Sequence, residues 1–325
     1  MIKYIYTFKI RARTRGGRRK RSFHIMTETL TLTEEFNNIC KCLAHYPLAG
    51  HSTFKIGGEA EYCAFPKTVG ELCALIKAAK MNGVRARVFG GGSNVLFSSS
   101  GVSGLIILTT EMKDISLEAG GVRALAGTRL SALCNFAARE SLSGAEFLFG
   151  IPGTVGGAVY MNAGAHGGEV SHILVESICY DRENDEIITL TAHDHAFGYR
   201  KSALMERPLI VLSSLFRLEA GNRSEIESKM KALTEKRRAS QPIEMPSAGS
   251  VFKRPEVGFA GKYIEDAGLK GTRIGGAEIS QKHAGFIVNA GGATSDDVLA
   301  LAEKARAEVF CKFGAELERE FIYVE

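Results

Sequence analysis

The stretch Phe147–Glu169 has the sequence FLFGIPGTVGGAVYMNAGAHGGE. It contains seven glycines and neither Lys nor Arg, and apolar side chains such as Phe149, Val155 and Met161 are interleaved with the glycines. A solvated linker would carry charge, whereas a buried backbone that passes close to a large flat ligand needs this composition. The stretch therefore predicts one wall of a ligand pocket, and a tightly turned structural loop is the alternative.

The overall composition is that of a globular protein with room for two or three domains. Of the 325 residues, 45% are hydrophobic and 24% are charged, which is ordinary. No apolar run is long enough for a transmembrane helix, so no membrane partner is expected. The seven cysteines are scattered without the paired spacing of a zinc site, and we expect free thiols, a cytoplasmic location and no metal.

The positive charge is concentrated at the N-terminus. Residues 1–25 hold nine Lys or Arg and no acid; without them, 32 basic residues face 36 acidic ones, although the whole chain carries a net charge of +5. An arm that binds nucleic acid is one interpretation. We favour a disordered tail or a true start at Met26, and expect no nucleic-acid partner. No secretory signal is predicted, because no apolar core follows the basic run.

A second glycine-rich motif follows a predicted strand–helix–strand unit. The unit comprises a strand over Glu61–Pro66, a helix from the capping box Thr68–Glu71 to Gly83, and a strand over Val84–Phe89. The following GGGSN, residues 90–94, offers several backbone N–H groups in one turn, which suits a phosphate. It is not a Walker loop, since no Gly-Lys-Ser/Thr follows, and Val95 stands where a Rossmann fingerprint has its third glycine.

The remaining pattern combines helices and strands. Helices are predicted over Leu32–Leu43, over Arg129–Leu142 with Thr128 as cap, from the capping box Ser224–Glu227 to Arg238, near Gly261–Ala267, and over Ser295–Phe313, closed by Gly314. Strands are predicted over Gly104–Thr109, Gly121–Ala126, His172–Asp181, Glu186–Leu190, Leu209–Leu218, Gly285–Asn289 and Leu317–Val324. His193 and His195 fall in a polar loop, where we expect both to be exposed.

Together the motifs resemble one family, the UDP-N-acetylenolpyruvoylglucosamine reductases, flavoenzymes that complete UDP-N-acetylmuramate for peptidoglycan. Seven motifs occur in the family's order over residues 45–325: HSTFKIGG, FGGGSNVLF, GIPGTVGGAVYMNAGAHGGE, FGYRKS, PSAGSVFKRP, GFAGKYIEDAGLKGTRIGGAEIS and LEREF. The span from Arg200 to Ser250 resembles the shorter family form, which lacks an inserted tyrosine-bearing loop. The departures are Lys55 and His166, where the family often has Arg and Tyr, and Arg254, where many members have Asn.

The resemblance implies an α+β protein with the FAD-binding fold of the vanillyl-alcohol oxidase (PCMH) type. It implies a FAD-binding domain over residues 45–222, with subdomains over 45–109 and 110–222, and a C-terminal α+β substrate-binding domain over 223–325. Residues 1–44 would form the basic N-terminal extension, and we expect a monomer.

FAD and NADPH are the cofactors that the resemblance implies. It assigns the FAD pyrophosphate to Gly90, Gly91, Gly92, Ser93, Asn94 and Val95, in agreement with the phosphate turn described above. It assigns the flavin ring to Gly150, Gly153, Thr154, Gly156, Gly157, Asn162, Ala163 and Gly164, in agreement with the pocket wall.

The implied reaction is a two-stage hydride transfer, from NADPH to FAD and then from flavin N5 to the vinyl carbon of the enolpyruvyl sugar nucleotide. Attack on this double bond builds negative charge toward the conjugated carboxylate, which calls for a cation. Arg200 resembles the family's cation, Glu320 its partner, and Ser250 the acid that protonates the adjacent carbon, with Lys253 as a hypothetical neighbour that stabilises the alkoxide. Substrate contacts are implied for Tyr199, Arg238, Lys253, Arg254 and Gln281.

Two other functions remain open on the sequence alone. The first is a flavin-dependent oxidase of the same fold, in which FAD is often attached covalently. The second is a nucleotide-binding regulatory protein, or an RNA binder that uses the basic arm. The occurrence of Arg200, Ser250 and Glu320 in their expected motifs favours the reductase over a protein that only binds.

Overall fold

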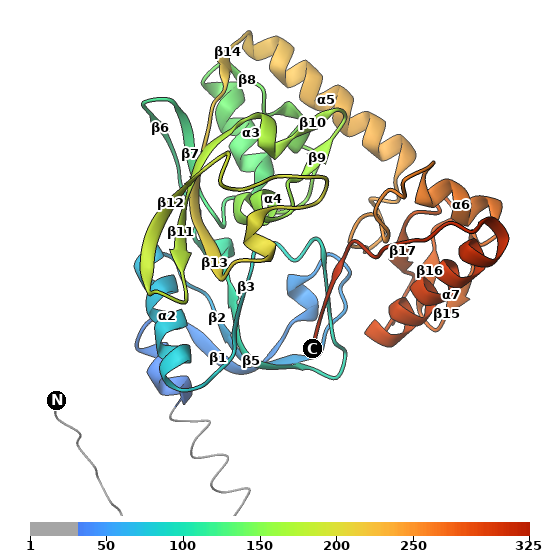
Figure 1. Ribbon diagram of the computed structural model, residues 1–325, viewed down its shortest axis with the longest axis horizontal. Helices are drawn as coiled ribbons and strands as arrows, with labels where there is room; N and C mark the ends of the chain where they lie inside the picture. Colours follow the sequence, from blue (N-terminus) through green and yellow to red (C-terminus); the bar gives the residue numbers. More distant parts are fainter. Residues whose placement is uncertain (1–31) are drawn as a thin grey trace, which may run out of the picture.

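The computed structural model describes residues 32–325. The basic run over residues 1–25 and Met26 lie outside the described residues, as does much of the predicted extension 1–44. Figure 1 shows two sheet-containing lobes beside each other and a C-terminal lobe set apart from them. None of the helices within residues 32–325 is long and apolar enough to cross a membrane.

The first lobe is built on a mixed four-stranded sheet of order β1-β2-β5-β3, in which β1 is antiparallel to β2 and the other pairs are parallel. Its elements are β1 (Cys42–Pro47), β2 (Glu59–Ala64), α2 (Val69–Met81), β3 (Ala86–Phe89) and β5 (Val102–Leu108). Leu72, Leu75 and Ile76 bury one face of α2 against the sheet. The predicted cap is confirmed, because the Thr68 hydroxyl accepts a hydrogen bond from Glu71 N at 3.1 Å.

The second lobe is an antiparallel five-stranded sheet of order β12-β11-β13-β7-β6. Its strands are β6 (Ile115–Glu118), β7 (Gly121–Leu125), β11 (Leu174–Asp181), β12 (Glu186–Thr191) and β13 (Leu209–Phe216). The helices α3 (Leu130–Arg139) and α4 (Val155–Tyr160) share its core. Two short strand pairs complete this part of the chain: β8 (Leu142–Ser143) with β14 (Glu219–Ala220), and β9 (Gly164–Ala165) with β10 (Gly168–Glu169).

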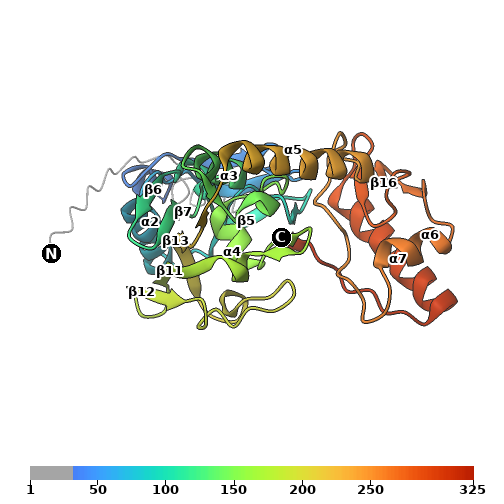
Figure 2. The same cartoon turned by 90° about the horizontal axis from the view of Figure 1, so that it is seen from above.

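The long helix α5 (Arg223–Ser240) runs from the second lobe to the C-terminal lobe (Figures 1 and 2). Its two buried residues, Ile226 and Met230, pack in the core of the second lobe. The C-terminal lobe contains α6 (Ala260–Asp266), α7 (Ser295–Phe313) and a sheet of β15 (Arg273–Ile274), β16 (Ala277–Ile279) and β17 (Ile287–Asn289). Gly314 ends α7 at φ +65°, as the sequence predicts, and Thr294 with Asp297 forms a capping box at its start.

The last strand, β18 (Ile322–Val324), returns to the first lobe. It pairs in parallel with β4 (Val95–Phe97), the strand that follows the GGGSN turn, so that Ile322 lies opposite Val95. The core of the C-terminal lobe in turn contains three residues from the N-terminal part of the chain: Phe54, Ile56 and Leu96. The lobes are therefore joined by shared core residues as well as by the chain.

Three local predictions were wrong. The helix expected over Leu32–Leu43 covers only residues 32–37, and β1 begins at Cys42, because its alternating residues pair with β2. Thr128 does not cap α3; its hydroxyl donates to Asp114 O at 3.1 Å. The cap of α5 is Asn222, whose side-chain oxygen accepts from Ser224 N and Glu225 N, so the helix begins before the predicted box.

Candidate active site

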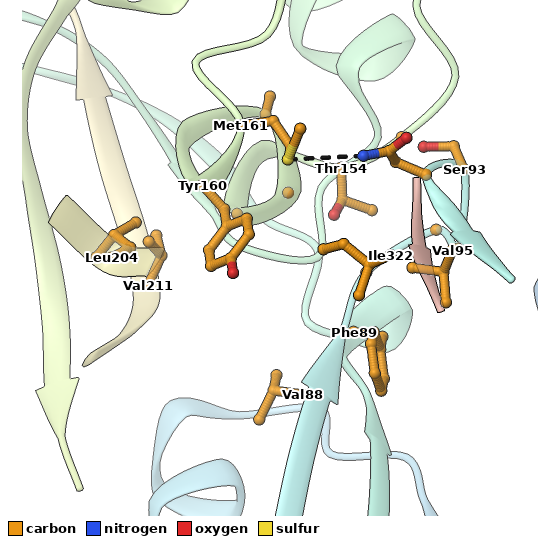
Figure 3. A pocket seen from close by; sticks show the side chains of 18 of the residues that line it. Val88, Phe89, Ser93, Val95, Thr154, Tyr160, Met161, Leu204, Val211 and Ile322 are labelled. Carbon is orange, nitrogen blue, oxygen red and sulfur yellow. Dashed lines mark hydrogen bonds between the residues drawn. The ribbon is translucent and has the colours of Figure 1, made fainter. Parts of the chain in front are cut away.

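A cavity of 1320 Å³ lies between the two sheets, and its lining also includes Gly249, Ser250 and Phe286 from the C-terminal part of the chain. We call it the first cavity; it exceeds the roughly 300–1,000 Å³ of pockets for drug-sized ligands. In Figure 3, Tyr160, Leu204 and Val211 line one side, and Phe89, Val95 and Ile322 line the other. The cavity has the size for a dinucleotide and apolar walls that suit an aromatic ring system.

Both glycine-rich motifs line the first cavity. The lining includes Gly90, Gly91, Gly92, Ser93, Asn94 and Val95, and also Gly153, Thr154, Gly156, Gly157, Ala163 and Gly164. Two predicted cofactor residues do not line it. The Gly150 carbonyl accepts a hydrogen bond from Arg237, and the buried Asn162 side chain accepts from Ser171 N and donates to Gly198 O, both at 3.0 Å.

At two positions of the GGGSN turn, neighbouring segments approach so closely that only glycine fits. A Cβ on Gly90 would lie 2.0 Å from the Thr154 hydroxyl, and one on Gly92 would lie 2.0 Å from the His51 carbonyl oxygen. Gly92 also has φ +60°, in the left-handed region that side chains rarely adopt. The backbone of residues 90–95 thus forms part of the cavity wall itself.

Buried polar atoms without partners show that this cavity is built for a polar ligand. The Thr154 hydroxyl, Arg87 Nη1 and Gln241 Oε1 are buried, have no hydrogen-bond partner among the described residues, and belong to lining residues. Such groups are costly unless something satisfies them. A ligand with phosphates, hydroxyls and a flat apolar ring would do so, and FAD fits the residues present.

Arg200 and Glu320 form an ion pair at the end of the first cavity. Arg200 Nε donates to Glu320 Oε1 at 2.7 Å, although Arg200 lies on the loop after β12 and Glu320 lies just before β18. Burial raises the pKa of Glu320, against the opposing effect of the Arg200 guanidinium. The carboxyl therefore holds its proton more readily than an exposed glutamate does.

The loop that carries Arg200 is held in a demanding conformation. Arg200 has φ +53°, a region that costs a non-glycine residue free energy and that is concentrated at functional sites. Asn162 Nδ2 donates to Gly198 O, and the Ser202 hydroxyl donates to Tyr160 O at 2.7 Å, so the loop is fixed to the glycine-rich wall.

Ser250 lies beside this ion pair because three backbone segments are paired there. Ser250 bridges to Phe286, Val251 N donates to Gly285 O at 2.9 Å, and Glu320 N donates to Val251 O at 2.8 Å. On the other side, Asn94 Nδ2 donates to Glu320 O at 3.2 Å. The GGGSN turn, the serine and the glutamate thus belong to one hydrogen-bonded arrangement.

A second cavity, of 520 Å³, extends from this point along the C-terminal lobe. Within residues 32–325, the three residues that line both cavities are Arg200, Ser250 and Glu320. The second cavity is lined by cations and aromatic rings: Tyr199, Phe252, Lys253, Arg254, Phe259, Lys262, Lys282 and His283. The three shared residues therefore stand where a ligand in one cavity would meet a ligand in the other.

The predicted substrate residues fall into two groups. Tyr199, Lys253 and Arg254 line the second cavity, whereas the exposed Arg238 and Gln281 line neither cavity. The residue beside Arg238, Arg237, lines the first cavity and holds the Gly150 carbonyl. The first cavity is also lined by residues that were not predicted: Arg87, Arg237 and the C-terminal Ile322–Glu325. Of these, only Arg237 had a signal in the sequence, the doubled arginine in EKRRAS.

The prediction that His195 is exposed was wrong. Its side chain is fully buried, with Nε2 3.0 Å from the Ser177 hydroxyl and the ring stacked 4.9 Å from that of Phe197. Burial lowers the pKa of His195 to about 4. His195 anchors the start of the Arg200 loop on the second sheet, and His193 is exposed as predicted.

The comparisons with known proteins agree with this arrangement. A FAD-binding domain model matches residues 60–190, and a model described as the C-terminal domain of UDP-N-acetylenolpyruvoylglucosamine reductase matches residues 241–324. A UDP-N-acetylenolpyruvoylglucosamine reductase of Streptococcus pneumoniae (strain JJA) is 45% identical over 274 residues, covering 84% of this chain and 91% of that protein. The crystal structure of the enzyme (MurB) from Thermus caldophilus superposes with a TM-score of 0.74 at 34% identity, covering 88% of this chain and 98% of that one.

The fold and the first cavity thus define a flavoprotein oxidoreductase with the predicted FAD-binding fold. More particularly, the chain belongs to the UDP-N-acetylenolpyruvoylglucosamine reductase family.

Proposed function

We propose that this protein reduces UDP-N-acetylenolpyruvoylglucosamine to UDP-N-acetylmuramate, with FAD as bound cofactor and NADPH as reductant, in the synthesis of peptidoglycan precursors. One observation carries the proposal beyond family membership. Arg200, Ser250 and Glu320 line both the cavity that fits FAD and the cationic second cavity. A flavin ring and an anionic substrate held in these cavities would meet at the three residues.

FAD, when bound, supplies the hydride that it has received from NADPH. The proposed role of Arg200 is to stabilise the negative charge that develops on the substrate carboxylate as the vinyl carbon is reduced. Glu320 holds the guanidinium in place through Nε, which leaves the remaining N–H groups of Arg200 for the substrate. Because burial raises the pKa of Glu320, a neutral carboxyl that donates a hydrogen bond is the alternative to this ion pair.

Ser250 is the proposed acid that protonates the second carbon of the former double bond. Its side chain is exposed into the cavities and its backbone is fixed by the pairing with Phe286. Lys253, the hypothetical neighbour of the serine, pairs with Glu318 at 2.6 Å. Because Lys253 also lies close enough to Glu320 to affect its pKa, we keep it as a substrate-binding candidate with Tyr199 and Arg254.

Arg238 and Gln281 are also proposed as substrate-binding residues. Arg238 and Gln281 would need to act from outside both cavities. A cytoplasmic location is supported by the seven cysteines, all of which are free in the structure. We propose a monomer, with the FAD-binding domain over residues 45–222 and the substrate domain over 223–325.

Anaerobic half-reaction spectroscopy tests the proposal. NADPH should bleach the oxidised flavin spectrum of the purified protein, and UDP-N-acetylenolpyruvoylglucosamine should then restore it. If air but not the enolpyruvyl substrate restores the spectrum, the protein is a flavin oxidase of the same fold and the proposal fails. Denaturation should release the flavin, because the proposal requires no covalent attachment.

A further inference from the structure

The outer end of the second cavity carries an exposed aromatic ring. Phe259 precedes α6 and is 58% exposed, an unusual fraction for a phenylalanine that lines a cavity. It closes the segment RPEVGF, residues 254–259, and the neighbouring Val257 is 74% exposed. This segment presents apolar surface that the protein itself does not cover.

The cation beside this ring differs from the other cations of the second cavity. Lys253, Lys262 and Lys282 each pair with a carboxylate: Glu318 at 2.6 Å, Asp266 at 2.5 Å and Glu244 at 3.6 Å. Among the described residues, Arg254 forms no salt bridge. Its guanidinium instead lies 4.5 Å from the centroid of the Phe259 ring. All of its charged N–H groups are therefore available to an anion.

The backbone of Arg254 is also tied to the reacting end of the cavity. Arg254 N donates to the Tyr199 hydroxyl at 3.2 Å, and Tyr199 directly precedes Arg200 in the chain. A ligand that reaches from Arg200 to Phe259 would therefore pass Tyr199 and Arg254 in turn. The order of groups along the cavity is a reacting end, a free guanidinium and an aromatic face.

We propose that Phe259 is the stacking platform for the base of the substrate nucleotide and that Arg254, on the same ring, binds its diphosphate. The inference rests on the proposed function, since it places the nucleotide end of the substrate whose enolpyruvyl end lies at Ser250. A planar guanidinium binds a phosphate through paired N–H groups. Any nucleobase can stack on an aromatic ring, because stacking uses the face of the base and not its hydrogen-bonding groups. The 520 Å³ of the cavity suits a nucleoside diphosphate portion.

Binding of UDP and of inorganic pyrophosphate to the FAD-loaded protein, measured by calorimetry, separates the two roles. Phe259→Ala should raise the Kd of UDP roughly 5- to 150-fold, the range for loss of one base–aromatic stack, and leave the Kd of pyrophosphate unchanged. Arg254→Gln should weaken both ligands. Phe259→Tyr, which keeps the aromatic face, should bind UDP like the wild type.

The matched control is Phe310→Ala on α7, which removes a ring that is 55% exposed and lines neither cavity. It should change neither Kd. Two results of Phe259→Ala would overturn the proposal. If the Kd values of UDP and pyrophosphate rose equally, the ring would only support Arg254. If the Kd of UDP did not change, the base would not stack on the ring. If the enolpyruvyl substrate does not re-oxidise the flavin of the wild-type protein, the proposed function fails. If it does, and Phe259→Ala does not selectively raise the Kd of UDP, this inference alone fails.

Discussion

The first cavity is lined by two glycine-rich backbone segments and apolar side chains, together with arginines such as Arg87 and Arg237, whereas the second, within residues 32–325, has no glycine-rich turn in its lining and is formed mainly by cationic and aromatic side chains. In the first, the glycines at positions 90 and 92 let two loops approach within distances that a Cβ would forbid. In the second, Arg254 and Phe259 project from a segment with little internal packing. A cofactor that stays bound can be held by a fixed backbone surface, while a substrate that must leave is bound by side chains. The Arg200 loop lies at the junction of the two.

The largest expected effect is the loss of bound flavin in Gly92→Ala, which tests whether the backbone of the first cavity holds the cofactor. The new Cβ would lie 2.0 Å from the His51 carbonyl oxygen, and φ +60° disfavours alanine, so the turn must move. We expect protein purified without bound flavin, measured by its visible absorbance. Gly70→Ala is the control, because this glycine of α2 has space for a methyl group and a helical backbone. Full flavin content in Gly92→Ala would show that the backbone wall does not hold the cofactor.

The next largest effect is expected on the rate of flavin re-oxidation when Arg200, which lines both cavities, is replaced. Arg200→Ala should slow re-oxidation of reduced flavin by the enolpyruvyl substrate about 10²- to 10³-fold, the usual loss for one group that stabilises developing negative charge. Stopped-flow measurement of re-oxidation checks it. Lys201→Ala removes an exposed ion pair with Glu206 and should leave the rate unchanged. Equal re-oxidation rates in Arg200→Ala and the wild type would show that Arg200 does not stabilise the developing negative charge.

A smaller effect, on stability, is expected from the anchor of the Arg200 loop. Burial lowers the pKa of His195 to about 4 in the folded protein, against 6.5 in the unfolded chain, while Asp194 raises it and Arg207 lowers it to a smaller extent. Between these values the unfolded state binds a proton that the native state does not, so stability should fall as the pH falls from 6.5 to 4. The loss is up to roughly 3 kcal/mol.

Denaturant unfolding at several pH values measures this slope. His195→Asn should flatten it, because the titrating group is gone, and the exposed His193→Asn should leave it as in the wild type. A wild-type slope in His195→Asn would mean that another group causes the pH dependence.

The smallest effect is expected from Thr154→Val, which removes the unpartnered hydroxyl in the first cavity. FAD should bind roughly tenfold more weakly for the loss of one hydrogen bond. The flavin-free protein should be no less stable, since the buried hydroxyl has no partner there. Flavin titration and thermal unfolding check the two statements. Loss of stability without loss of affinity would contradict the role of Thr154 in cofactor binding.

The sequence predicts the first cavity better than the second, for a physical reason. Close backbone approach requires glycine at fixed positions, so the turn at residues 90–94 and the wall at 150–168 are visible as motifs. Most of their residues line the cavity, and the strands around them were found from hydrophobic patterns. The predicted helix caps at Thr128 and Ser224 were wrong. Asn222, two residues earlier, caps α5 in place of Ser224. The Thr128 hydroxyl donates to the Asp114 carbonyl, and α3 has no side-chain cap.

Features that depend on contacts between residues far apart in the chain were not predicted from the sequence. The burial of His195 depends on its contact with Ser177 of β11, which no local pattern brings to it. The choice between Arg237 and Arg238 depends on which face of α5 meets Gly150, and the return of β18 to β4 joins positions far apart in the chain. Phe259 lies in a motif that the sequence shows, but its exposure beside Arg254 becomes apparent only in the fold.

Ser250→Ala, measured in the two anaerobic half-reactions, tests whether the three residues shared by the two cavities carry the chemistry. NADPH should reduce the flavin of this variant at the wild-type rate, because that step needs no proton from the serine. The enolpyruvyl substrate should then fail to re-oxidise the flavin. Equal loss of both half-reactions, or re-oxidation at the wild-type rate, would contradict the account.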